Sequence, residues 1–271
     1  MKQITYQDFI RYLRSYDRCI PGEMLTENFI AFEKEYLSDQ KLMFFYYSGC
    51  VCSYDIQSSN ESAHIYCLIY QVADNCDLEN MIIKCKEKIE AERLKYPSIF
   101  PCLFASVKFS LSERYAPNLA TIHFSYIGMK SSDNINPNIK VLDSGHKNEI
   151  IQMCEPYKNS DTEFGKQLAQ TFSDYDWEGN HQFLGFYDEK KLVGIVSYHF
   201  CVKADLACLC DIFVIPEYRK KGVGKALLLE TLSKYPNKRW LYQASIYNTP
   251  SQELALSVGF IKNGALLVFD L

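Results

Sequence analysis

The chain has 271 residues, of which 48% are hydrophobic and 23% are charged, and its net charge is −4. The length is about right for two domains, the composition is that of a globular protein, and the acidic balance gives no electrostatic reason to expect nucleic-acid binding. No apolar run approaches the ~20 residues that cross a bilayer, and the first residues contain no apolar core of signal-peptide length. We therefore expect a cytoplasmic protein with neither a membrane nor a nucleic-acid partner.

The sequence predicts an α/β domain for residues 1–130. Helical patterns occupy 6–38 and 78–89, and strand patterns occupy 41–47, 64–72, 107–111 and 122–126. Roughly the same succession of helices and strands follows in the second half of the chain. One interpretation is therefore that the first half is a degenerate structural repeat of the second half. The residues alone leave that question open.

A polar segment from Ser131 to Asn138 is the best candidate linker, so the second domain is predicted to span 139–271. Its predicted strands are 139–142, 182–187, 192–200, 206–214, 240–247 and two short strands around 262–264. Its predicted helices are 146–157, one opening at a capping box at 160–163, one with an apolar stripe at Leu228, Leu229, Leu232 and Tyr235, and one from Thr249 to Gly259. The predicted fold class is α/β, with a mixed central sheet flanked by helices.

The cysteines and histidines of the chain show no metal-binding spacing. The eleven cysteines are scattered, and their closest pairs are C-x-C at Cys50 and Cys52 and at Cys208 and Cys210, without a second pair at zinc spacing. The five histidines form no H-x-x-x-H or H-E-x-x-H pattern. We therefore expect no metal, and we expect most of the cysteines to be small apolar residues in sheets.

The stretch VIPEYRKKGVGKALL, residues 214–228, joins a predicted buried strand to a helix through a basic, glycine-containing turn. A helix start leaves main-chain N–H groups without partners and carries partial positive charge, and glycines let a ligand approach the backbone closely. A diphosphate is therefore the expected ligand, with Arg219, Lys220, Lys221 and Lys225 adding charge. The turn does not match a Walker A loop, because Ala226 follows Lys225 where that loop needs serine or threonine. It does not match a dinucleotide-binding fingerprint either, because Leu227 stands where that motif needs glycine.

Two motifs of this half resemble a known family. Arg219-x-x-Gly222-x-Gly224 is similar to the Q/R-x-x-G-x-G/A signature of the GNAT (GCN5-related) N-acetyltransferases. Farther along, Asn248, Ser251, Leu254 and Gly259-Phe260 resemble the family's second signature, N-x-x-A/S-x-x-L-Y-x-x-x-G-F, at nearly every position. The resemblance covers about residues 139–271.

The resemblance implies an acyl-CoA N-acyltransferase fold and acetyl-CoA as co-substrate, with no metal. The amine of an unidentified acceptor would attack the thioester directly. It also implies that Ile212, Phe213 and Val214 pair with the pantetheine arm and that Asn248, with Ser251, faces the arm from the other side. The pyrophosphate would be held by Arg219, Lys220, Lys221, Gly222, Val223, Gly224 and Lys225.

The sequence departs from the family pattern at the residue that usually donates a proton to the leaving thiolate. That tyrosine position is Ala255 here, and Tyr242 and Tyr247 are only weak substitutes among twenty tyrosines. Asp211 is the candidate base for the acceptor amine, and the alternative for Asp211 is a structural carboxylate. Glu217 is expected to be exposed and without a role.

Three functions remain open on the residues. The first is N-acetyl transfer from acetyl-CoA to a primary amine of a small molecule or a protein. The second is a non-catalytic acyl-CoA-binding module, and the third is an acyltransferase that uses a longer or carrier-bound acyl donor. The sequence does not decide whether the protein is a monomer or a homodimer.

Overall fold

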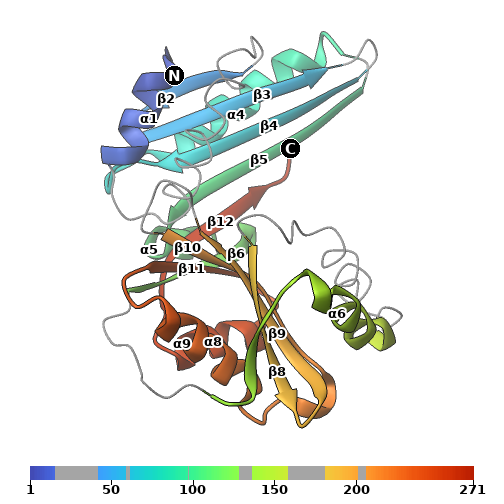
Figure 1. Cartoon of the computed structure of the whole chain (residues 1–271). Helices are drawn as coiled ribbons and strands as arrows, with labels where there is room; N and C mark the ends of the chain where they lie inside the picture. The colour runs from blue at the N-terminus through green and yellow to red at the C-terminus, as the bar shows by residue number, and fades with distance from the viewer. Residues whose placement is uncertain (16–41, 59–61, 97, 128–135, 158–180, 201–205) are drawn as a thin grey trace. The chain divides into compact units, whose positions relative to one another are not determined.

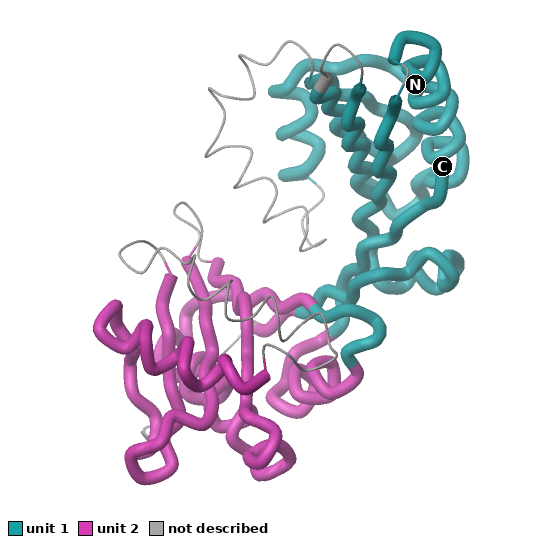
Figure 2. The backbone as a smooth tube through the Cα atoms, turned by 90° about the vertical axis from the view of Figure 1, so that its right-hand side faces the viewer, with its two compact units in different colours: residues 1–124, 244–248, 262–271 teal, residues 125–243, 249–261 magenta. Residues whose placement is uncertain are grey.

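The computed structural model describes residues 1–15, 42–58, 62–96, 98–127, 136–157, 181–200 and 206–271. It divides into two compact units (Figure 2). Unit 1 comprises residues 1–124, 244–248 and 262–271, and unit 2 comprises residues 125–243 and 249–261.

Unit 1 is built on a mixed sheet whose strands have the order β1-β2-β3-β4-β5-β12-β6 (Figure 1). The parallel pair is β4 with β5, whereas β1 with β2, β2 with β3, β3 with β4 and β5 with β12 are antiparallel. The strands are β1 Lys2–Ile4, β2 Met43–Tyr47, β3 Cys50–Ser58, β4 Ser62–Gln71, β5 Ser98–Lys108, β6 Leu119–Ile127 and β12 Ile261–Phe269. The helices are α1 Tyr6–Ser15, α4 Leu78–Arg93, α5 Phe109–Ser112 and the 3₁₀ helix η1 Glu113–Asn118.

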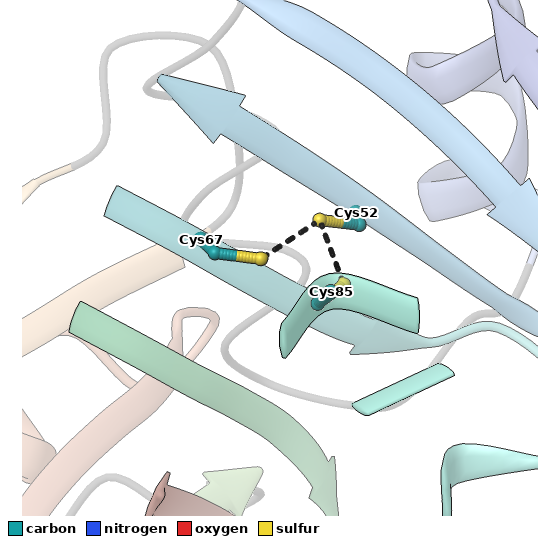
Figure 3. A group of neighbouring side chains, drawn as sticks. All are labelled: Cys52, Cys67 and Cys85. Carbon is teal, nitrogen blue, oxygen red and sulfur yellow. Dashed lines mark hydrogen bonds between the residues drawn. The ribbon is translucent and has the colours of Figure 1, made fainter. Parts of the chain in front are cut away.

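The two faces of this sheet carry separate cores, because successive strand residues point to opposite sides. Phe44 packs with Phe9 of α1, while its neighbour Phe45 packs in the core that contains Met81 and Ile89 of α4. In the α4 core, Cys52 of β3, Cys67 of β4 and Cys85 of α4 bring their sulfurs together (Figure 3). The Sγ of Cys52 lies 3.3 Å from that of Cys67 and 3.9 Å from that of Cys85, and all three side chains are fully buried.

Unit 2 has a mixed sheet with the strand order β11-β10-β9-β8-β7. β10 and β11 are parallel, and the other neighbours are antiparallel. The strands are β7 Ile139–Leu142, β8 His181–Asp188, β9 Lys191–Phe200, β10 Leu206–Val214 and β11 Arg239–Ser245. The helices are α6 Lys147–Cys154, α8 Val223–Lys234, α9 Thr249–Ser257 and the 3₁₀ helices η2 Ser144–His146, η3 Glu155–Tyr157 and η4 Pro216–Tyr218.

The central strand β9 of unit 2 is covered by helices on both faces. Val193 and Ile195 pack in a core with Ile150 of α6. Gly194, between them, faces α8 so closely that a Cβ there would lie 2.9 Å from Val223. This double coverage explains the nearly continuous apolar sequence of β9.

The predicted fold class is confirmed, and both units run in the succession strand, helix, three strands, helix, strand within the described residues. Four details of the prediction were wrong. Residues 50–58 form a full strand, of which only the pair Cys50 and Cys52 was expected to lie in a sheet, Phe109 and Leu111 lie in a short helix, the carboxyl-terminal residues form one strand instead of two, and Leu229 is exposed on α8. The predicted helix at 160–163 and most of the helical pattern in 6–38 lie outside the described residues. Among the described helices, none is long and apolar enough to span a bilayer.

Candidate functional site

The parallel strands β10 and β11 are hydrogen-bonded along only part of their length. Their pairing joins Leu206 with Arg239, Ala207 with Trp240 and Cys208 with Leu241. Beyond that point β10 continues to Val214, and its remaining pairing is to β9 on the other side. The printed pairing with β11 thus covers residues 206–208, and β10 runs on beyond it to Val214, where an extended ligand could lie alongside residues 212–214.

A β-bulge interrupts β10 at the same place. Leu209 pairs with Tyr198 of β9, but Asp211 pairs with Ser197, so Cys210 is the extra residue of the bulge. A bulge turns the local main chain and re-aims its side chains and N–H groups. The strand therefore changes direction where its pairing with β11 ends.

The turn after β10 contains two residues in the left-handed region. Lys220 has φ of 61° and Gly222, the residue before α8, has φ of 84°. Turns of this kind direct successive main-chain N–H groups toward one concave side, where an anion can bind. A Cβ added to Gly222 would have nothing within 4 Å among the described residues, so this side of the turn is open.

The start of α8 contributes further donors. The N–H of Ala226 donates to the carbonyl of Gly222 at 2.9 Å, so the N–H groups of Val223, Gly224 and Lys225 precede the first bond of that kind. Lys220, Lys221 and Lys225 are exposed around them. The structure thus brings the predicted pyrophosphate residues 219–225 together at one helix start.

Arg219 has a second contact that the sequence did not predict. Its Nε donates to the carbonyl of Val214 at 2.9 Å, and its guanidinium lies 5.9 Å from the ring centre of Phe213. The arginine therefore links the turn to the end of β10. Ile212 and Val214 are half-buried, whereas Phe213 is buried in the core with α6.

Gly224 is constrained by packing as well as by its place in the turn. A Cβ on Gly224 would lie 3.2 Å from Cδ2 of Leu254, which belongs to α9. The absence of a side chain at Gly224 therefore lets α8 and α9 approach each other closely. The family resemblance alone did not indicate this second role.

The residues of the second motif lie at the start of α9. Asn248 precedes this helix and donates its N–H to the carbonyl of Ser245, and Gly259 follows it with φ of 98°, as a left-handed helix end requires. Ser251 is hydrogen-bonded to the hydroxyl of Tyr242. The structure therefore gives Ser251 a protein partner in addition to the predicted coenzyme contact.

Asp211 lies directly after the bulge and is held by Ser197 of β9. The hydroxyl of Ser197 accepts from the Asp211 N–H at 3.0 Å and donates to its Oδ2 at 3.3 Å. The side chain of Asp211 is half-buried. This arrangement fixes the carboxylate at the bulged edge of β10, next to the residues predicted to bind the coenzyme.

The two tyrosines considered as substitutes for the missing acid, Tyr242 and Tyr247, differ in their burial. Ala255 is fully buried in α9, and Tyr247 is 88% exposed. Tyr242 is buried, and this burial raises the pKa of Tyr242 although the hydrogen bond to Ser251 opposes it. Neither tyrosine is assigned as the proton donor. Glu217 is exposed as expected and accepts a hydrogen bond from the hydroxyl of Tyr157.

Sequence reasoning missed a group of potential metal ligands in unit 2. His181 of β8, His199 of β9 and Cys210 of β10 place their donor atoms within 4.8 Å of one another, and Cys52, Cys67 and Cys85 of unit 1 do the same. No spacing rule could reveal either group, because the members of each come from different elements. The expectation of no metal therefore rested on sequence spacing alone, and it stays a prediction.

Comparisons with known proteins match a family model to part of the chain. The model of the acetyltransferase (GNAT) family matches residues 149–260. No curated protein matches the chain. Among solved structures, a GCN5-related N-acetyltransferase from Sphaerobacter thermophilus is 13% identical with a TM-score of 0.56, over 98% of this chain and 93% of that one.

Two further solved structures cover nearly the whole chain. An acetyltransferase from the GNAT family of Colwellia psychrerythraea is 12% identical with a TM-score of 0.55, over 99% of this chain and 98% of that one. A tandem GNAT protein from the clavulanic acid biosynthesis pathway is 10% identical with a TM-score of 0.50, over 99% and 97%. At these identities the likeness shows the fold, which extends over both units.

Proposed function

Because residues 149–260 match the model of the GNAT family of acetyltransferases, we propose that this protein transfers the acetyl group of acetyl-CoA to a primary amine of a small molecule or a protein. The observation that carries the proposal is the turn between β10 and α8, with its left-handed Lys220 and Gly222 and its exposed lysines. This turn directly follows the strand that loses its parallel partner after Cys208. Both features suit one extended ligand that ends in a diphosphate.

In this proposal the coenzyme lies along β10 and ends at α8. The pantetheine amides pair with the main chain of residues 212–214, and the diphosphate accepts hydrogen bonds from the N–H groups at the start of α8. Lys220, Lys221 and Lys225 add Coulombic attraction, which salt would screen. Arg219 keeps the turn attached to the strand through the Val214 carbonyl.

The chemical step needs a base for the amine and stabilisation for the developing oxyanion. Asp211, held by Ser197, is the candidate base, because it lies at the bulged edge of β10. Main-chain N–H groups at the bulge are candidates to donate hydrogen bonds to the oxyanion and so stabilise it. The leaving thiolate has a pKa near that of a free thiol, about 8.5, so it can leave without full protonation although position 255 is alanine.

We propose one coenzyme per chain, in the GNAT domain at 139–271, with the domain at 1–130 as a repeat that has lost this site. In unit 1 the turn before α4 has no glycine, and the side chain of Asp77 already accepts from the N–H of Asn80. Asp74 lies in the same turn. Two carboxylates at a helix start repel a diphosphate, so unit 1 offers no second site of this kind.

Coenzyme binding is tested by calorimetric titration of the protein with acetyl-CoA. Gly224→Val is expected to weaken binding by about a hundredfold or more, since its side chain would displace the diphosphate from several main-chain donors. The expected stoichiometry for the wild type is one per chain.

The Cβ of the valine in the Gly224→Val variant would also contact Leu254, so a loss of binding could come from disturbed packing instead of exclusion of the ligand. A second background is needed to separate these two effects. We therefore propose the same substitution in Leu254→Ala, which provides room for the added methyl groups. Leu254→Ala alone should bind acetyl-CoA, and the double variant should fold but not bind. Binding by the folded double variant would show that the diphosphate lies elsewhere.

The catalytic role of Asp211 is tested with Asp211→Asn, which keeps the size of the side chain. Once a panel of amines has given an acetylated product by mass spectrometry, kcat is expected to fall about 10²- to 10⁴-fold while the affinity for acetyl-CoA stays the same. Glu217→Gln is the matched control. Glu217 is an exposed carboxylate that, like Asp211, precedes the proposed coenzyme turn in the sequence. Unchanged kcat in Asp211→Asn would leave the aspartate with a structural role only.

Ala255 favours one alternative, a non-catalytic acyl-CoA-binding module. This alternative predicts coenzyme binding that Gly224→Val abolishes, without acetylation of any amine in the panel. A protein that transfers longer or carrier-bound acyl groups would instead show weak binding of free acetyl-CoA. Mass spectrometry is preferred to a thiol-release assay, because the eleven cysteines would react with the usual reagent.

A further inference from the structure

Three neighbouring strands of unit 2 each bring one metal-ligating side chain to the same point. His181 is the first residue of β8 and pairs with His199 of β9, and Cys210 is the bulged residue of β10. The rings of the two histidines are 5.2 Å apart, and Nδ1 of His199 lies 3.1 Å from Sγ of Cys210. We propose that these three residues bind a zinc ion.

The distances between the donor atoms are close to those of a metal site. With Zn–N bonds of about 2.0 Å and Zn–S bonds of about 2.3 Å, tetrahedral ligation places an imidazole nitrogen about 3.6 Å from a thiolate sulfur. All three donor atoms already lie within 4.8 Å of one another. Side-chain rotations that move the donor atoms by about one ångström are therefore enough to place an ion between them.

The chemistry of this donor set also suits a zinc ion. Two neutral imidazoles and one thiolate leave a single positive charge on bound Zn²⁺, and binding releases one proton from the Cys210 thiol to solvent. All three side chains are half-buried, so an ion can reach them. Three protein ligands leave the fourth position for water or for a donor atom of a small molecule, as in catalytic zinc sites.

The cysteine cluster of unit 1 is a weaker candidate on the same criteria. Cys52, Cys67 and Cys85 are fully buried in an apolar core, where the loss of solvation disfavours the charged thiolates that a metal needs. Three thiolates would also leave a negative charge on a bound divalent ion. The ordinary interpretation of this cluster, small side chains that fill a core, is sufficient.

The experiment uses the full-length protein, stripped of metal and kept reduced with a non-thiol reductant. Zn²⁺ is titrated in competition with a chromophoric chelator, and Co²⁺ is added separately as a spectroscopic probe. One ion per chain is expected, and Co²⁺ should show a thiolate charge-transfer band together with the intense visible absorption of a tetrahedral site.

Substitutions at the proposed ligands decide whether this is the site. Cys210→Ser should abolish the charge-transfer band and weaken Zn²⁺ binding more than about a hundredfold, since even changes beyond the ligands cost about 10- to 100-fold. His181→Gln should weaken binding while the charge-transfer band remains at saturating Co²⁺. Cys52→Ala is the matched control and should leave both unchanged.

Two outcomes would overturn the proposal. If Cys52→Ala, and not Cys210→Ser, removes the cobalt spectrum, the ion lies in the core of unit 1. If the wild type binds neither ion, the 3.1 Å contact between His199 and Cys210 is a hydrogen bond only. Circular dichroism of each variant should show wild-type secondary structure, because the three strands are already paired in the sheet without the ion. This result excludes unfolding as the cause of a loss of metal binding.

Discussion

His123 of β6 is buried in unit 1, with 3% of its surface exposed, and neither ring nitrogen has a hydrogen-bond partner among the described residues. Burial without a partner disfavours the charged imidazolium and lowers the pKa of His123 from 6.5 to about 4. The residue is therefore neutral in the folded protein at neutral pH. In the unfolded chain it takes up a proton at higher pH than in the folded protein.

This difference predicts a loss of stability in acid. Between pH 6.5 and 4 the unfolded state binds a proton that the folded state does not, so the free energy of unfolding falls as the pH falls through that window. The contribution of His123 is constant above about pH 7 and reaches a loss of about 3 kcal/mol near pH 4. Urea unfolding at several pH values measures this loss.

His123→Leu isolates that contribution, because leucine fills a similar volume and does not titrate. The variant should lose about 3 kcal/mol less than the wild type between pH 7 and pH 4. His64→Leu, at an exposed histidine of β4, controls for the exchange of residue type. Parallel pH profiles for the wild type and His123→Leu would contradict the prediction.

At the scale of elements, two β-bulges determine which side chains meet in unit 2. Next to the hairpin turn Asp188 pairs with Lys191, and this register, if continued, would place His181 opposite Tyr198. The bulge between Phe186 and Tyr187 shifts the partner to His199. A shift of one residue reverses the face of every later side chain, so the bulge is what brings the two histidines together.

The sequence predicted the two strands, 182–187 and 192–200, but not the bulge between them. The candidate site likewise has a part that the sequence predicts and a part that it does not. The proposed coenzyme turn is a local pattern within seven consecutive residues, so the sequence alone could group its glycines and cations. The contacts of Asp211 with Ser197 and of His199 with Cys210 depend on the register between strands. Register reflects packing and bulges that no single segment encodes, so these contacts became visible only in the structure.

The same distinction explains which elements were predicted correctly. β10 was predicted at its exact bounds, because a long apolar strand between turns is a strong local signal. The segment around Lys262, Asn263 and Gly264 was predicted as a turn, since such residues favour turns. Gly264 instead pairs with Lys108 of β5, and the strand runs unbroken to Phe269. Tertiary pairing overrides local preference there.

At the scale of the whole molecule, the last strand of the chain completes the sheet of unit 1. β12 lies between β5 and β6 in the strand order, and its residues from Gly264 to Phe269 pair with β5. Ala265 and Leu267 are fully buried in the core that α4 covers. The expected domains, 1–130 and 139–271, therefore differ from the compact units at the carboxyl end, because β12 lies within the expected second domain in sequence but belongs to unit 1.

This path of the chain predicts that residues 1–130 do not form a stable domain alone. Without β12 the fragment lacks the buried side chains of Ala265 and Leu267 and leaves the inner edge of β5 unpaired. Loss of a single buried leucine costs about 2–5 kcal/mol, and the stability of a whole domain is about 5–15 kcal/mol. An unpaired strand edge also favours aggregation. The fragment should therefore aggregate or unfold without a cooperative transition in urea.

A matched pair of chains tests the cause. Leu267→Ala in the full chain should unfold cooperatively, with stability lowered by about 2–5 kcal/mol. A chain ending at residue 260 should lose more than that, because it lacks the whole of β12. Co-expression of 1–130 with 131–271 should restore a soluble complex, since the second fragment supplies the strand. A fragment 1–130 that unfolds cooperatively by itself, or a shortened chain as stable as Leu267→Ala, would show that unit 1 does not depend on the strand from the carboxyl end.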